Sequence, residues 1–169
     1  MAIELISQPT REKWAWLAGL IDGEGCIHIE RRKTKKGYIC YQLCVSMSMT
    51  DKKTIETAHH ISGVGSLGKF DGRNPRCKPC YRWLATDCNA EKILINCLPF
   101  LVTKRKHAEL GLVFMQSRHL FKAGNGRPTP HDVISERERL RMAVKFLNHK
   151  GPTQNIMTAL EEKSGETGG

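Results

Sequence analysis

One carboxylate in this sequence stands where it could hold a metal ion. Glu24 follows an apolar run, 14–21, that predicts a buried helix, and Gly23 and Gly25 are expected to end that helix. We therefore expect Glu24 just past the helix end, where unpaired main-chain carbonyls disfavour a carboxylate by about 0.3–1 kcal/mol. A divalent cation such as Mg²⁺, bound by Glu24 and a nearby carbonyl, would offset that cost because it prefers oxygen ligands. The alternative is a glycine-capped buried helix followed by an incidental exposed glutamate.

A second set of metal-ligating residue types gives a weaker signal. Cys77 and Cys80 have CxxC spacing, but no second CxxC or nearby CxxH completes a zinc site, and Cys88 and Cys97 are loose candidates. Seven cysteines are an odd number for a disulfide framework, so reduced thiols are expected. A turn with incidental thiols is the favoured interpretation.

The net charge indicates the class of partner. The 169 residues carry a formal charge of +10, and residues 1–150 alone carry +12 because the last nineteen residues are net acidic. Such an excess favours a polyanion, with nucleic acid first, over a solvated basic surface without a partner. A composition of 40% hydrophobic and 26% charged residues excludes a disordered or collagen-like chain. No run approaches the roughly 18 apolar residues of a membrane span, so no membrane partner is expected.

Hydrophobic periodicity predicts an α+β fold. Apolar and polar residues alternate over 26–32 and 38–49, which predicts a hairpin with one wet face, and a second, weaker hairpin is expected at 66–70 and 81–86. Helices are expected at 10–21, 51–61, 89–97, 103–122 and 131–148. Helices should cover one face of an antiparallel sheet and leave the other for a ligand. Residues 1–150 form one expected domain, followed by a tail, 151–169, with little order after about residue 158.

The polar strand faces and the basic hairpin tips are the expected nucleic-acid surface. A two-stranded ribbon fits the major groove of DNA, where Arg pairs with guanine and Gln with adenine. The expected base readers are His28, Glu30, Arg32, Gln42, Cys44, Ser46, Ser48 and Arg82. Residues at hairpin tips more often contact phosphate, and this set is Arg31, Lys33, Lys35, Lys36, Arg73, Arg76 and Lys78.

Residues 17–25, Leu-Ala-Gly-Leu-Ile-Asp-Gly-Glu-Gly, resemble the nine-residue signature of the LAGLIDADG homing endonucleases and depart from it only at Gly23 and Glu24. The resemblance covers about residues 10–122. It implies the family's α-β-β-α-β-β-α fold with a saddle-shaped antiparallel sheet, here followed by extra C-terminal helices. The motif occurs once and the chain has no internal repeat. The resemblance therefore implies a homodimer whose signature helices meet, with an interface of Trp16, Leu17, Ala18, Gly19 and Leu20.

The same resemblance implies the chemistry. Glu24 and the Gly23 carbonyl would hold Mg²⁺, or another divalent cation such as Mn²⁺, which lowers the pKa of the attacking water. Asp51, after the second strand, would help to position water, although it also fits as a helix N-cap. The expected reaction is hydrolysis of both strands of a long, roughly palindromic DNA site, leaving short 3′ overhangs.

A run 99–106 resembles the family's Pro-Phe-Leu segment and catalytic lysine, which assigns Lys104 to stabilising charge on the scissile phosphate. Lys53 is a weaker basic candidate. Two alternatives share the fold: an intron maturase, which would bind RNA, and a nuclease-dead DNA-binding regulator. The expected location is intracellular, in a prokaryotic cytoplasm or inside an organelle whose genome encodes the protein, and the length favours an intron origin.

Overall fold

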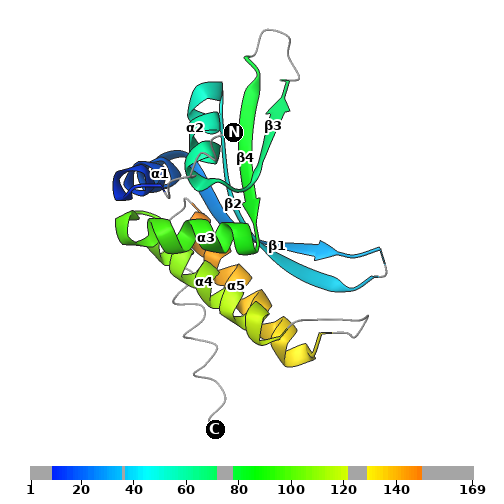
Figure 1. Ribbon diagram of the computed structural model, residues 1–169. Helices are drawn as coiled ribbons and strands as arrows, with labels where there is room; N and C mark the ends of the chain where they lie inside the picture. Colours follow the sequence, from blue (N-terminus) through cyan, green and yellow to red (C-terminus); the bar gives the residue numbers. More distant parts are fainter. Residues whose placement is uncertain (1–8, 36, 72–77, 122–128, 150–169) are drawn as a thin grey trace, which may run out of the picture.

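Paired strands alternate with helices along the chain (Figure 1). The computed structural model describes residues 9–35, 37–71, 78–121 and 129–149. Its elements are α1 (Arg11–Glu24), β1 (Gly25–Lys33), β2 (Ile39–Met49), α2 (Lys52–Ser62), β3 (Ser66–Phe70), β4 (Cys80–Thr86), α3 (Cys88–Cys97), the 3₁₀ turn η1 (Leu98–Phe100), α4 (Arg105–Leu120) and α5 (His131–Asn148). The α+β prediction and the predicted element order are confirmed. The predicted tail, 151–169, lies outside the described residues.

The strands form one antiparallel sheet in the order β1-β2-β4-β3, so β2 is flanked on both sides. The β1–β2 and β3–β4 hairpins point in different directions from the body of the protein (Figure 1), so the sheet is strongly twisted. Alternation divides it into two faces. Ile27, Leu43, Val45 and Trp83 belong to the apolar face, and all are fully buried against the helices.

The opposite side of the sheet is called the polar face here. In β1, β2 and β4 it carries Cys26, His28, Glu30, Arg32, Cys40, Gln42, Cys44, Ser46, Ser48, Arg82, Leu84 and Thr86, as the pairing register requires. The predicted separation of Ile27 and Ile29 from His28 and Glu30 is confirmed. The polar face is the side of the sheet that was predicted to be left free for a ligand.

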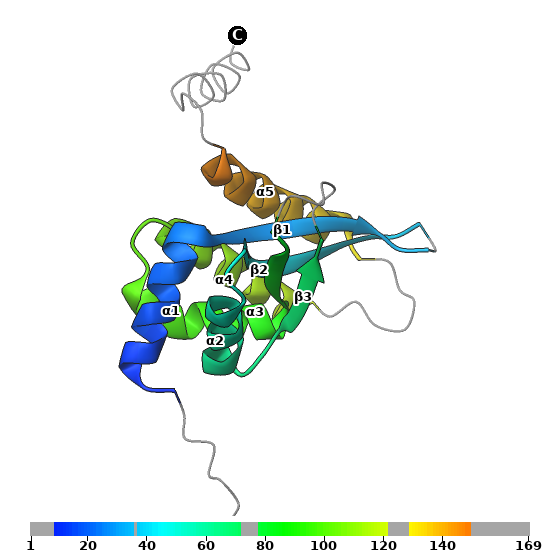
Figure 2. The ribbon, with the colours of Figure 1, turned by 90° about the horizontal axis from the view of Figure 1, so that it is seen from above.

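Helix α5 lies along β1, the edge strand (Figure 2). Asn148 donates from its amide to the main-chain oxygen of Ile27 at 2.9 Å. The Tyr41 hydroxyl donates to the Glu138 carboxylate at 2.7 Å, where Glu138 also pairs with Arg141. These bonds attach the predicted extra helix to the sheet, and α4 packs between α3 and α5. Among the described helices, none has the length and apolar content needed to cross a bilayer.

Helix α1 has one buried stripe. Trp14, Leu17, Ala18 and Ile21 recur at helical spacing and are buried in the core of the chain. Within the chain only this stripe is buried, so the prediction that so apolar a helix is buried on more than one face stays a prediction that needs a partner. Leu17 and Ala18 have no exposed surface, which corrects their assignment to a dimer interface.

The other side of α1 is exposed and carries few large side chains. Trp16 is 43% exposed, Gly19 and Gly23 are exposed, and Leu20 is half-buried. A Cβ added at Gly19 or Gly23 would meet nothing within 4 Å. This exposed face of α1, made by Trp16, Gly19, Leu20 and Gly23, leaves room for a second helix to approach closely.

The end of α1 differs from the prediction by one turn. Glu24 is the last helical residue and does not lie past the helix end, because the helix continues through Gly23. Gly25 begins β1, and its N–H donates to the Ile21 carbonyl. A Cβ at Gly25 would lie 2.7 Å from that carbonyl oxygen, so glycine is needed for the close passage from helix to strand.

Candidate functional site

The last turn of α1 is tied to the start of α4 by Asp22. The Asp22 carboxylate accepts hydrogen bonds from the main-chain N–H of Val102 at 2.7 Å and of Lys104 at 2.8 Å. The Lys104 ammonium donates to the main-chain oxygen of Asp22 at 2.5 Å. A cation is favoured there because the carbonyls at a helix C-terminus carry partial negative charge. The structure therefore holds the Lys104 ammonium at the end of α1, on the carbonyl of the residue two positions before Glu24.

Asp22 is the site residue that sequence reasoning missed. It lies within the nine-residue motif, but no role was predicted for it there. The missed signal was a carboxylate in the last turn of a helix, where it is unfavourable unless donors offset its charge. The two main-chain N–H groups that offset it lie 80 and 82 residues away along the chain, so the sequence could not indicate them.

Glu24 and Gly23 lie exposed at the same helix end. The carboxylate and the main-chain oxygens of this last turn are hard oxygen donors. Such a donor set suits Mg²⁺ or Mn²⁺, so the residues present fit the predicted cation. The chain thus brings an anionic group, main-chain oxygens and the Lys104 ammonium to one end of one helix.

Arg82 adds a second positive charge near this end. Partial burial raises the pKa of the Cys26 thiol, and the charges of Lys104 and Arg82 oppose that rise. Both cations therefore lie close enough to Cys26, two residues after Glu24, to act on its thiol. Arg82 was predicted as a base reader, and the structure places it on the polar face, as the cross-strand partner of Ser48.

Asp51 caps α2. Its carboxylate accepts from the Thr54 N–H at 3.1 Å and from the Thr54 hydroxyl, and these bonds hold the pKa of Asp51 below its usual range. The N-cap interpretation is confirmed, and a catalytic role for Asp51 stays a prediction. Lys53, the weaker candidate, is exposed in the first turn of α2.

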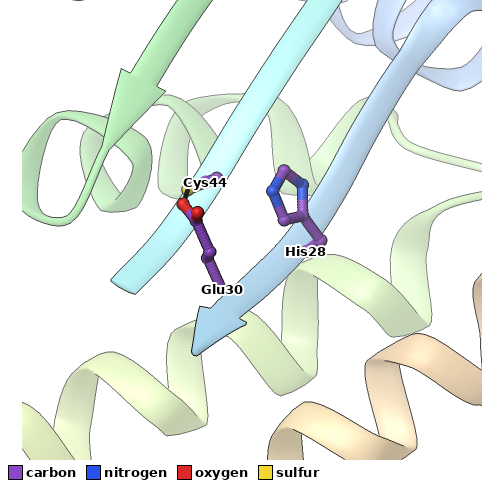
Figure 3. Close-up of side chains that lie close together, drawn as sticks. All are labelled: His28, Glu30 and Cys44. Atoms are coloured by element: carbon purple, nitrogen blue, oxygen red, sulfur yellow. Dashed lines mark hydrogen bonds between the residues drawn. The ribbon is translucent and has the colours of Figure 1, made fainter. Parts of the chain in front are cut away.

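Three predicted base readers meet on the polar face. His28 and Glu30 alternate with Ile29 along β1, and Cys44 is the cross-strand partner of His28 on β2. Figure 3 shows the Glu30 carboxylate beside the Cys44 sulfur of β2, and the His28 ring comes from β1, the same strand as Glu30. One ligand atom from each residue lies within 4.8 Å of the others. Burial lowers the pKa of His28 and raises that of Cys44 to about 11, so both groups are neutral at pH 7.

Two predicted readers are less accessible than expected. Cys44 is 1% exposed and Ser46 is 8% exposed. Both lie on β2, which has a neighbour on each side, and strand alternation does not reveal which strand is central. The prediction that their side chains are open to a groove is therefore wrong for the isolated chain. Ser48, nearer the end of β2, is exposed.

Gln42 is part of a hydrogen-bonded group at the edge of β2. Its amide donates to Asp87 at 3.0 Å, and Arg118 donates to the same carboxylate at 2.8 Å and to the Tyr41 carbonyl at 2.7 Å. These contacts support β2 where β4 has ended. Gln42 was predicted as a base reader; its amide group is engaged by Asp87 in this structure, and base reading by Gln42 stays a prediction.

The described residues of the predicted basic hairpin tips are exposed: Arg31, Lys33 and Lys35 at the end of the β1–β2 hairpin, and Lys78 before β4. Arg32, a predicted base reader, is exposed beside the first of these tips. Lys36, Arg73 and Arg76 lie outside the described residues, as does Cys77. Cys97 is buried, with its thiol 3.9 Å from the Trp14 carbonyl, while Cys88 is exposed. Within the described ranges, the one group of at least three ligating residues close enough for a metal is His28, Glu30 and Cys44. Because Cys77 is not among the described residues, the interpretation of the CxxC cysteines as incidental thiols stays a prediction.

Comparison with known proteins places these features in a family. A family model described as LAGLIDADG endonuclease matches residues 17–107. DNA endonuclease I-CvuI of Chlorella vulgaris is 30% identical over 105 residues, which are 59% of this chain and 62% of that protein. The aligned region therefore spans less than two thirds of that relative.

Solved structures show the same fold. The crystal structure of homing endonuclease I-CvuI in complex with its target and Ca gives a TM-score of 0.69 at 21% identity, covering 91% of this chain and 96% of that one. The archaeal intron-encoded homing endonuclease I-Vdi141I, complexed with DNA, gives 0.65 at 13% identity, covering 90% and 96%. The predicted saddle-sheet fold is thus confirmed.

Proposed function

The chain belongs to the LAGLIDADG endonuclease family, and from that premise we propose that it is a site-specific homing endonuclease that hydrolyses both strands of a DNA duplex. The observation that carries the proposal is the end of α1, where exposed Glu24 and the Lys104 ammonium stand at the start of the polar face. The comparisons support it, because relatives that share the fold are named DNA endonucleases and were solved with DNA.

Glu24 and the Gly23 carbonyl would hold the divalent cation, Mg²⁺ or Mn²⁺. When bound, such a cation lowers the pKa of a water molecule and neutralises charge on the leaving oxygen. Glu24 contributes the negative charge that keeps the cation at the helix end. Glutamine at this position would keep an oxygen ligand but would remove that charge.

Lys104 stabilises negative charge that develops on the scissile phosphate. Its ammonium is already positioned by the Asp22 carbonyl, and its main chain by the Asp22 carboxylate, so little rearrangement is needed when DNA binds. Asp22 is therefore a positioning residue in this proposal. Asp51, exposed at the start of α2, is the candidate for orienting water.

The exposed face of α1 supports a homodimer. One chain carries one Glu24, and cutting two strands requires two such sites. Two copies that pair through Trp16, Gly19, Leu20 and Gly23 would be related by a two-fold axis, and the small residues allow the helices to approach closely. Both helix ends would then lie near that axis, and such a dimer would make closely spaced cuts with short 3′ overhangs at a roughly palindromic site.

The polar face and the basic hairpin tip would hold the DNA. His28, Glu30, Ser48 and Arg82 offer polar atoms to base edges, while Arg31, Lys33 and Lys35 at the tip suit phosphates. Since cations supply this contact, binding should weaken steeply as salt concentration rises. A flat salt response would contradict the assignment of this surface.

The test is cleavage of a duplex library by the purified protein with Mg²⁺, read by sequencing the ends, with a chelator as the control. Discrete double-strand cuts at one long sequence, lost with the chelator, would support the proposal. Tight RNA binding without cutting would favour the maturase alternative. Sequence-specific DNA binding without cutting under any divalent cation would favour a DNA-binding regulator.

A further inference from the structure

The polar face holds a group of donors unlike those at the end of α1. His28, Glu30 and Cys44 offer one nitrogen, one carboxylate and one sulfur, all within 4.8 Å of one another (Figure 3). The end of α1 offers oxygens only through Glu24 and its neighbouring carbonyls. Because sulfur and imidazole ligands favour zinc over magnesium, the two groups suit different cations.

We propose that His28, Glu30 and Cys44 form a second metal site, which takes Zn²⁺ and is separate from the site of Glu24. The inference concerns ligand chemistry on the polar face and stands whether or not the protein cuts DNA.

One pair of ligand atoms is close to the spacing that zinc needs, and the other pairs lie within 4.8 Å. Bonds of about 2.0–2.3 Å in a tetrahedral site place ligand atoms about 3.5 Å apart. The Cys44 sulfur lies 4.0 Å from a Glu30 oxygen, only about half an ångström beyond that spacing. Rotation of the Glu30 and His28 side chains can close the remainder, because both are only half-buried.

The backbone around the group is rigid. His28 and Cys44 face each other as a cross-strand pair, and Glu30 lies two residues further along the same face of β1. Cys44 is also paired with Thr86 of β4, so its strand is held on both sides. Ligands on strands with fixed register need only small side-chain movements, which lowers the cost of assembling a site.

The sulfur ligand is shielded and weakly engaged. Cys44 is 1% exposed, and its thiol contacts only acceptors at long range, a Glu30 oxygen at 4.0 Å and the Gln42 carbonyl at 3.8 Å. Zinc would replace the thiol proton, and the charges of the resulting thiolate and of Glu30 would balance the charge of the ion. Three protein ligands leave a fourth position for water.

Two nearby arginines determine how tightly the site is expected to bind zinc. Arg32 pairs with Glu30 at 2.7 Å, but the two side chains are 51% and 40% exposed, so this ion pair costs little to loosen. The positive charge of Arg82 acts on His28, Glu30 and Cys44, and it would oppose a cation. We therefore expect a dissociation constant on the order of micromolar, weaker than in zinc fingers.

The test titrates Co²⁺, a spectroscopic substitute for Zn²⁺, into the full-length, reduced, metal-free protein. The expected result is one Co²⁺ per chain, with visible bands of a tetrahedral ion and a sulfur-to-cobalt charge-transfer band, both abolished by one equivalent of Zn²⁺. Cys44→Ser and His28→Gln should each weaken binding by at least about 100-fold and remove the bands.

Three matched controls separate this site from the others. Cys40→Ser replaces an exposed cysteine on the same strand and should leave the bands unchanged. Glu24→Gln and the double change Cys77→Ser/Cys80→Ser should do the same. Circular dichroism would establish that each variant is folded, and His28→Gln keeps the test valid if Cys44→Ser does not fold.

Two kinds of result would overturn the inference. One is a wild-type protein that shows no charge-transfer band or binds Co²⁺ only at millimolar concentration. The other is a stoichiometric band that survives in folded His28→Gln or disappears in the Cys77→Ser/Cys80→Ser variant, since the metal would then lie elsewhere.

Discussion

The substitution Asp22→Asn tests whether Asp22 holds Lys104 in place, and it leaves the proposed metal ligand Glu24 unchanged. The Asp22 carboxylate accepts two main-chain N–H groups, at 2.7 and 2.8 Å, one of them that of Lys104 itself. Hydrogen bonds to a charged group contribute about 1.5–3 kcal/mol each. Asparagine keeps one acceptor oxygen but turns an NH₂ group toward the other N–H, so one bond and the charge are lost.

The expected loss of folding free energy is about 2 kcal/mol for Asp22→Asn, which corresponds to a fall in Tm of about 4–8 °C for a chain of this size. Asp22→Ala loses both bonds, and we expect about 2–4 kcal/mol, because water can reach the exposed Val102 N–H. Loss of the bond from the Lys104 N–H should let the main chain of Lys104 shift. We therefore expect the rate of DNA cleavage to fall by a larger factor than the affinity for DNA.

The assay combines thermal unfolding with single-turnover cleavage and DNA binding at a temperature where every variant is folded. Asp132→Asn is the matched control, because Asp132 is exposed in the first turn of α5 and its loss should cost less than about 1 kcal/mol. An Asp22→Asn protein with wild-type Tm and wild-type cleavage would refute the anchoring role.

Three further changes test other parts of the structure. Gly25→Ala should destabilise the fold by about 1–3 kcal/mol, because its Cβ would lie 2.7 Å from a main-chain oxygen of α1; Gly68→Ala, whose Cβ would make only an ordinary contact at 3.5 Å with the Phe70 ring, should cost much less, and equal Tm losses would contradict this. Gly19→Arg should leave the monomer folded but prevent self-association in sedimentation experiments; persistent dimers would exclude the exposed face of α1 as the interface. Hydrogen bonding from Arg141 lowers the pKa of Glu138 from 4.5 to about 2, so Glu138→Gln should be less stable than wild type at pH 7, with a gap that closes as pH falls from about 4.5 towards 2; a constant gap would count against the ion pair.

The pattern of apolar and polar residues predicted the helices and strands well, because each type of secondary structure has its own local periodicity. Residues 131–148 were predicted as a helix and form α5 with those bounds. The alternation of Ile27 and Ile29 with His28 and Glu30 gave both faces of β1. Such signals need only neighbouring residues, so no knowledge of the tertiary structure was required.

The wrong predictions concern which residues of a helix or strand are covered by the rest of the chain. An α1 that is apolar on nearly every side cannot reveal which stripe enters the core, and the core takes Leu17 and Ala18. Alternation placed Cys44 on the polar face but could not show that β2 is central and that the thiol is therefore shielded. Likewise, the Asp22 anchor depends on a contact more than 80 residues away in the chain.

The most direct test of the central claim is single-turnover cleavage by Glu24→Gln on the duplex selected by the wild-type protein, with Mg²⁺, alongside DNA binding measured with Ca²⁺. We expect the cleavage rate to fall by at least about 1,000-fold while DNA affinity changes only a few-fold, because the proposed role of the Glu24 carboxylate is to hold the cation and Glu24 lies in α1, outside the strands. Cleavage at a rate near that of the wild type by the pure variant would contradict it.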